Sequence, residues 1–98
     1  MDRSSILIFL QEHKAEFTAK FGISKIALFG SFSRDEATDQ SDIDLLVGYV
    51  NNPGDVYTNK RNFKKFLQDY FHRNIDIANE KYLKSFAKDA ILKDAIYV

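Results

Sequence analysis

Three aspartates stand in apolar, strand-like surroundings, where a carboxylate is unfavourable unless water or a cation faces it. Asp42 and Asp44 are two residues apart, so on a strand both side chains point to the same face. Asp76 stands between Ile75 and Ile77 in a second short apolar alternation. If the two strands are neighbours, about 4.8 Å apart, the three carboxylates form one cluster. Such a cluster suits Mg²⁺ or Mn²⁺, and it could hold two metals roughly 3.5–4 Å apart for in-line phosphoryl displacement.

A second group of residues points to a bound phosphate. Gly30 follows an apolar run and lets the backbone approach a phosphate closely. The next amides are donors if a helix begins there, and Ser31 adds a hydroxyl. Arg34 is a further candidate for the phosphates, although a surface arginine paired with Asp35 or Glu36 explains it equally well. Neither G-x-x-x-x-G-K-[ST] nor G-x-G-x-x-G occurs in the chain.

Each of these features alone has a simpler explanation. A Gly-Ser pair is usually a turn, and two aspartates at the start of a strand are usually a solvated strand end. The combination is more informative, because a glycine turn, an Asp-x-Asp strand and a third acidic strand occur in one short chain. It predicts a site for a nucleotide and a metal.

The elements that position these residues alternate between helix and strand. Apolar residues recur at helical spacing in three segments, at 4–20, 57–72 and 80–97. Short β-prone runs predict three strands, at 25–29, 41–50 and 75–78. Residues 31–40 are expected to form a short helix or turn, and 51–55 a loop. We expect the first helix to begin at Ser4 or Ser5 and to end at Gly22.

This order favours an α/β (α+β) fold in which helices cover a small sheet. The 98 residues are expected to form a single domain spanning 1–98. Hydrophobic residues at 45% and charged residues at 29% are typical of globular proteins. The absence of cysteine excludes disulfides and thiolate metal sites, and two histidines make a zinc site unfavourable. No apolar run suits a signal peptide or a membrane span, so we expect a cytoplasmic protein without a membrane partner.

The charges are balanced overall but unevenly distributed. The net charge of zero disfavours nucleic acid as the partner. Residues 30–55 carry six acids and one base, whereas residues 56–98 carry nine bases and five acids. This asymmetry suits a site that holds a cation and a phosphate together, although ordinary solvated helix faces also account for it.

Two motifs together resemble the minimal nucleotidyltransferase family, the small members of the DNA polymerase β-like superfamily. They are residues 28–34, LFGSFSR, and residues 41–47, SDIDLLV. Residues 82–97 are also similar to the closing helix of that family, so the resemblance covers nearly the whole chain. The chain departs from the pattern at Asp35, where many relatives have glycine, and this adds a negative charge near the turn.

The resemblance implies a polymerase β-like nucleotidyltransferase core, with a mixed three-stranded sheet flanked by helices. It implies Mg²⁺-dependent transfer of a nucleotide, usually AMP from ATP, to a hydroxyl with loss of pyrophosphate. By matched position, Gly30 and Ser31 would bind the β- and γ-phosphates. Asp42 and Asp44 would ligate the metals, and Asp76 would complete the second metal site and help to activate the hydroxyl.

The resemblance also implies a protein partner. Many minimal nucleotidyltransferases are antitoxins encoded beside a HEPN-domain toxin, and some add AMP to a tyrosine of that toxin. The catalytic core is expected to use all 98 residues, so the acceptor would come from another protein or from a homo- or hetero-oligomer. Five aromatic residues are candidates for the interface: Phe32, Tyr49, Tyr57, Tyr82 and Tyr97.

Two other functions remain open at this point. The chain could be an antitoxin that binds nucleotide without turnover and neutralises its partner by forming a complex. It could also modify a small molecule, as aminoglycoside-modifying relatives do, but those relatives carry an additional acceptor domain.

Overall fold

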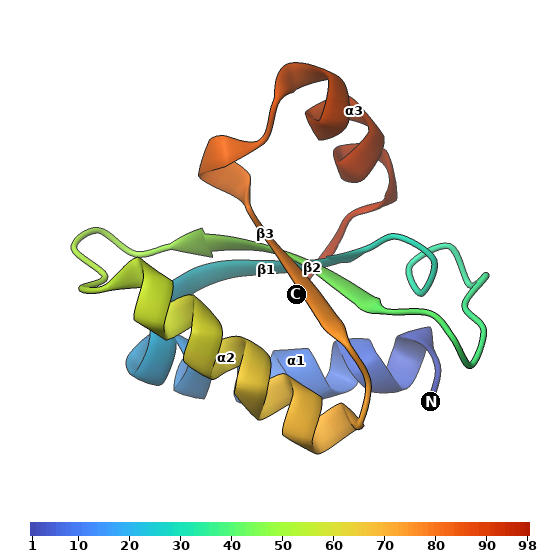
Figure 1. Cartoon of the computed structure of the whole chain (residues 1–98), viewed down its shortest axis with the longest axis horizontal. Helices are drawn as coiled ribbons and strands as arrows, with labels where there is room; N and C mark the ends of the chain where they lie inside the picture. The colour runs from blue at the N-terminus through green and yellow to red at the C-terminus, as the bar shows by residue number, and fades with distance from the viewer.

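The chain forms one four-stranded sheet with two long helices on one face and a short helix on the other (Figure 1). The computed structural model describes all residues, 1–98. The elements in chain order are α1 (Arg3–Phe21), β1 (Ile23–Phe29), β2 (Ile43–Tyr49), α2 (Val56–Phe71), β3 (Ile75–Asn79), a 3₁₀ turn η1 (Glu80–Tyr82), α3 (Ser85–Asp94) and β4 (Ile96–Tyr97). None of the helices combines the length and the apolar composition that crossing a membrane requires.

The sheet is mixed, with strand order β3-β2-β1-β4. β1 pairs antiparallel with both β2 and β4, whereas β2 and β3 are parallel. A parallel pair needs a crossover between its strands, and α2 provides it. The predicted α+β class and mixed sheet are confirmed, but the predicted number of three strands is wrong because β4 adds a fourth.

The core lies between the sheet and the two long helices. Alternate residues of β2, namely Ile43, Leu45 and Val47, are fully buried there against Phe17 of α1 and Phe63 of α2. Because successive side chains of a strand point to opposite faces, the residues between them face the other side, where α3 lies (Figure 1). The buried residues Ile43 and Leu45 therefore fix the face on which Asp44 lies.

The ends of the first helix differ partly from the prediction. The N-cap is Asp2, whose carboxylate accepts a hydrogen bond of 2.9 Å from the Ser5 backbone N–H. Ser5 returns the contact, because its Oγ accepts a 3.1 Å bond from the Asp2 N–H. The serine is therefore the second member of a capping box. Gly22 ends the helix as predicted, with φ of 68°.

The expectation of one helix at the C-terminal end is wrong, whereas of the two alternatives for the segment after β1, a short helix or a turn, the structure has the turn. The predicted helix at 80–97 is divided into η1, α3 and β4. Ile96 and Tyr97 pair with Leu28 and Ala27 of β1, so sheet pairing overrides the helical spacing of the apolar residues. Residues 31–35 form a turn without a helix, and Asp35 has φ of 61°, in the left-handed region that favours glycine.

Candidate functional site

Two of the predicted site residues lie side by side in the sheet. Asp44 of β2 and Asp76 of β3 are register partners in the parallel pair. Asp44 is half-buried, whereas Asp76 is exposed. Both project from the face opposite the apolar core, because the residues flanking each of them pack into it. Asp42 precedes β2 and is exposed. The condition on which the cluster depends, that the two acidic strands are neighbours, is therefore met for Asp44 and Asp76.

The Asp44 carboxylate lies in an unfavourable electrostatic environment. Burial, the charge of Asp76 and the charge of Asp42, in that order, raise its pKa from 3.8 to about 6, and the charge of Arg34 opposes them. No side-chain or backbone donor of the chain forms a hydrogen bond to the Asp44 carboxylate. Ionised Asp44 is thus only partly compensated within the chain, and an added cation would stabilise it.

Gly30 brings the turn after β1 directly against this carboxylate. Its φ is 77°, which an L-residue rarely adopts, and a Cβ at this position would overlap Oδ2 of Asp44 and lie 3.0 Å from its Cγ. The glycine is therefore required for two independent reasons, the backbone conformation and the close approach.

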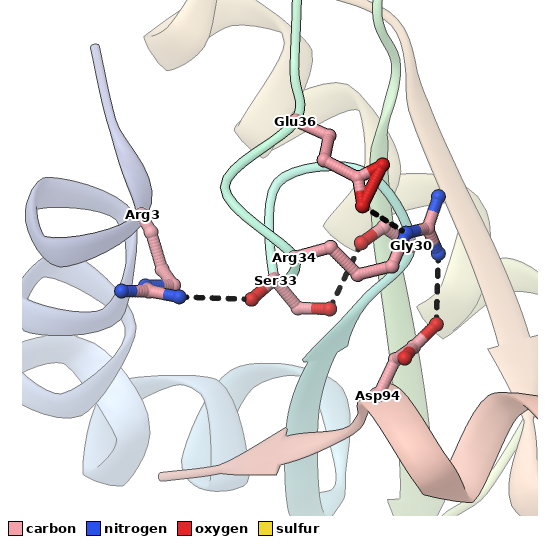
Figure 2. Close-up of polar contacts among 6 residues, drawn as sticks. All are labelled: Arg3, Gly30, Ser33, Arg34, Glu36 and Asp94. Carbon is pink, nitrogen blue, oxygen red and sulfur yellow. Dashed lines mark hydrogen bonds and ion pairs between the residues drawn. The ribbon is translucent and has the colours of Figure 1, made fainter.

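Hydrogen bonds within the turn, and one from α1, fix the conformation of the turn after β1. The carbonyl of Gly30 accepts a 2.9 Å bond from Ser33 Oγ and a 3.2 Å bond from the Arg34 N–H. Arg3 of α1 donates to the carbonyl of Ser33 over 3.1 Å (Figure 2). The backbone N–H groups of Ser31, Phe32 and Ser33 donate no hydrogen bond within the chain. Three successive amides of the turn thus lack a partner within the chain, and successive unpaired amides are donors that suit an anion.

The two other predicted phosphate ligands differ in their surroundings. Ser31 is half-buried, and its hydroxyl forms no hydrogen bond within the chain. Arg34 donates from Nη1 to Oδ2 of Asp94 over 2.8 Å, and its Nε lies 3.4 Å from Glu36 (Figure 2). The hydrogen bond to Asp94 raises the pKa of Arg34. Of the two ion pairs expected for Arg34, the one with Glu36 is present and the one with Asp35 is absent. The ion pair with Asp94 is not indicated by the sequence.

Sequence reasoning missed three residues that build the site. Ser33 is buried and shapes the glycine turn, and Asp94 holds Arg34. Arg73 donates from Nη1 to the carbonyl of Ser41 over 2.7 Å, which fixes the chain just before Asp42. Only Ser33 had a local sequence signal, a hydroxyl three residues after the turn glycine. The other two contacts join residues 32 and 60 positions apart.

The carboxylates suit a hard divalent cation in chemistry but do not form a complete cage. No three carboxyl or imidazole groups of the chain lie close enough together to hold a metal ion by themselves. The neighbouring charges of Asp44 and Asp76 nevertheless oppose each other, and a cation between them would remove this repulsion. Mg²⁺ in particular binds through one or two carboxylates, with water and substrate phosphate completing its shell. The residues present fit that mode of binding.

The predicted site is not inside an enclosed cavity. The largest cavity, about 590 Å³, lies at the opposite end of β2 beside Tyr49, and a smaller one of about 140 Å³ lies between Arg3, Asp35 and Arg73. The three aspartates line neither of them. Asp42 and Asp76 are nevertheless exposed, so a second molecule can reach them from the surface.

The aromatic residues predicted for an interface fall into two groups. Tyr57, Tyr82 and Tyr97 are exposed, at 74%, 73% and 48%. Phe32 is buried at 4% exposure, so the prediction is wrong for it. Tyr49 packs against the core, and its hydroxyl is buried without a hydrogen-bond partner.

Comparison with known proteins agrees with this geometry. The nucleotidyltransferase domain family matches residues 10–98. The protein adenylyltransferase MntA of Thermococcus cleftensis is 30% identical over 89 residues, covering 91% of this chain and 88% of that protein. A solved minimal nucleotidyltransferase has a TM-score of 0.78 at 28% identity, covering 98% of this chain and 95% of that one.

A further solved structure shows the same fold at lower identity. It is the complex of a tri-AMPylated Shewanella oneidensis HEPN toxin with an MNT antitoxin. The TM-score is 0.60 at 16% identity, with 97% of this chain and 66% of that chain covered. The family match and the MntA relative, together with the glycine turn beside Asp44, lead to one conclusion: the chain belongs to the nucleotidyltransferase domain family and is a minimal nucleotidyltransferase.

Proposed function

We propose that this nucleotidyltransferase transfers AMP from ATP to a hydroxyl of a separate protein, a HEPN-domain toxin for which it is the antitoxin. The observation that carries the proposal is the contact of the Gly30 turn with Asp44, beside Asp76 on the adjacent strand. This contact supports the proposal, because the turn amides would be donors for a triphosphate and the adjacent carboxylates would bind its counter-ions. The relative named protein adenylyltransferase MntA and the AMPylated toxin complex support the choice of acceptor.

The turn would bind the triphosphate. The free amides of Ser31, Phe32 and Ser33 and the hydroxyl of Ser31 are hydrogen-bond donors on one short segment. Arg34 adds a positive charge from the same segment. Phosphoryl transfer depends mainly on positioning and on stabilising charge. Such a preorganised donor set would therefore lower the activation barrier of the transfer without a covalent bond between protein and nucleotide.

The aspartates would hold Mg²⁺ and prepare the acceptor. Asp42 and Asp44 would be the metal ligands, and Asp76 would complete the second metal site; bound Mg²⁺ supplies charge neutralisation of the phosphates. The acceptor hydroxyl oxygen forms a bond to the α-phosphorus, and the bond from that phosphorus to the bridging oxygen of pyrophosphate breaks. Asp76 is exposed on β3, so it can accept or orient the hydroxyl proton of an incoming side chain.

The acceptor would be a side chain of the toxin, with tyrosine as the proposed residue. Asp42 and Asp76 are exposed, which permits a folded partner to present the hydroxyl. A small-molecule acceptor is less favoured, because the aspartates line neither of the two cavities described above.

The test is the intact mass of the HEPN partner after incubation with this protein, ATP and Mg²⁺. Addition of one or more AMP groups by the wild type, and none by Asp44→Asn, is the expected result. Peptide mapping then identifies the modified residue. An unchanged partner mass in the presence of active, folded enzyme would refute the proposal.

One observation favours a second function, neutralisation of the toxin by binding alone. Tyr82 and Phe86 are exposed at 73% and 77%, and α3 buries none of its residues, so this region could contact a partner without chemistry. This alternative predicts that an Asp42→Asn, Asp44→Asn double variant still neutralises the toxin fully in a growth assay. AMP transfer predicts that it does not.

A further inference from the structure

We infer that Asp94, the last residue of α3, positions the Arg34 guanidinium for the phosphates of the nucleotide. The inference rests on the proposed function and extends it to a residue outside both motifs. Arg34 Nη1 and Asp94 Oδ2 are 2.8 Å apart, and the two residues are 60 positions apart in the chain. Figure 2 shows the two side chains meeting beside the Gly30 turn.

Asp94 is the stronger of the two partners of Arg34. Glu36 lies 3.4 Å from Nε, and its side chain is 65% exposed. The Asp94 side chain is only 22% exposed, and its contact has the length of a charge-assisted hydrogen bond. An arginine that is 43% exposed has many rotamers when free, so the contact with Asp94 selects one of them.

The position of Asp94 is itself unfavourable for the helix. A negative charge in the last turn of a helix opposes the helix dipole, and α3 ends with Asp94. This helix also buries none of its residues and has no side-chain N-cap. Its own stability therefore does not explain an acid at this position, whereas the contact with Arg34 does.

The backbone after Asp94 is anchored next to the turn. Ile96 of β4 pairs with Leu28 of β1, two residues before Gly30. The short β4 strand thus carries Asp94 to the end of β1, where the phosphate turn begins. This pairing fixes the position of the Asp94 carboxylate, which in turn limits where the Arg34 guanidinium can lie.

Arg34 retains donors for a ligand while it is held in this way. A guanidinium has five N–H groups, and its contacts with Asp94 and Glu36 involve only Nη1 and Nε. The positive charge of Arg34 partly offsets the effects that raise the pKa of Asp44. The Arg34 guanidinium is planar and already held by Asp94, so it loses less conformational entropy when it binds a phosphate than a free arginine side chain does.

The test is titration with a non-hydrolysable ATP analogue and Mg²⁺, alongside KM and kcat for AMP transfer. For Asp94→Asn we expect about tenfold weaker binding of the analogue, the size of one lost charged hydrogen bond. We expect KM for ATP to rise similarly while kcat changes little. Asp94→Glu keeps the carboxylate and should recover most of the affinity.

Two controls separate positioning from a structural effect. Asp89→Asn removes an exposed acid of the same helix and should bind the analogue like the wild type. In an Arg34→Ala background, Asp94→Asn should cause no further loss. Equal or tighter binding by Asp94→Asn, or fully additive losses in the double variant, would overturn the inference.

The outcome is distinguishable from failure of the proposed function. If the wild type binds the analogue but modifies no partner, the proposed function fails, and a tenfold loss in Asp94→Asn still supports positioning. If the wild type modifies its partner and Asp94→Asn binds and transfers normally, only the positioning role of Asp94 fails.

Discussion

Replacing Asp44 with asparagine should abolish transfer and at the same time stabilise the metal-free fold. The pKa of Asp44 is raised from 3.8 to about 6 by burial, Asp76 and Asp42. Between these pH values the folded chain holds a proton that the unfolded chain has lost. The stability associated with protonated Asp44 is therefore complete below pH 4 and is lost as the pH rises through 6. Asparagine is neutral throughout and avoids that loss.

The size of the effect follows from the shift. At ~1.36 kcal/mol per pKa unit, a shift of about two units has an upper limit of about 3 kcal/mol. Asp44 is only half-buried, so solvent screening reduces this to about 1–2 kcal/mol. For a domain of this size, that corresponds to a rise in Tm of roughly 4–12 °C at pH 7.5.

The assay is thermal unfolding of the wild type and Asp44→Asn in EDTA at pH 7.5 and at pH 4. The variant should be more stable at pH 7.5, and the difference should disappear at pH 4. Asp39→Asn is a matched control, because Asp39 is an exposed acid in the turn region. Equal or lower stability of Asp44→Asn at pH 7.5 would refute the electrostatic reasoning.

Three other predictions concern the same site. Gly30→Ala should destabilise the fold by about 1–2 kcal/mol in an unfolding experiment, because alanine is unfavourable at this positive φ. The new Cβ should also displace Asp44 and lower AMP incorporation by about 100-fold. Ser33→Ala should destabilise the fold by about 1 kcal/mol because a buried hydrogen bond to Gly30 is lost, and urea unfolding measures this. Mg²⁺ should raise the Tm of the wild type more than that of Asp44→Asn, and equal shifts would count against Asp44 as a ligand.

Local patterns predicted the catalytic strands correctly. Asp44 and Asp76 each alternate with fully or nearly fully buried residues, and that period of two determines the face on which they lie. The pattern excludes a slip of one residue, which would move a carboxylate into the core, but a slip of two residues would keep the face, so the register that makes Asp44 and Asp76 partners comes from the structure.

The parts that sequence reasoning missed depend on contacts between distant residues. Ile96 and Tyr97 fit a helical spacing, and only their pairing with β1 makes them a strand. The contact of Asp94 with Arg34 follows from that strand and has no local pattern. Asp2 and Ser5 cap α1 together, because the Asp2 carboxylate accepts from the Ser5 N–H and Ser5 Oγ accepts from the Asp2 N–H. The sequence pattern indicates only a serine as the cap.

Stability and function make opposite demands at Asp44 and the same demand at Gly30 and Ser33. Asp44 is held between Ile43 and Leu45, both fully buried, so the core keeps its carboxylate close to Asp76 despite the repulsion. Removing that charge would stabilise the metal-free fold and would also remove the proposed metal ligand. Gly30 and Ser33 each favour both the fold and the turn, because the glycine allows the positive φ and the close approach and the serine donates a hydrogen bond to its carbonyl. Variants that gain stability while losing transfer therefore identify the residues that touch the reacting groups, and variants that lose both identify those that support them.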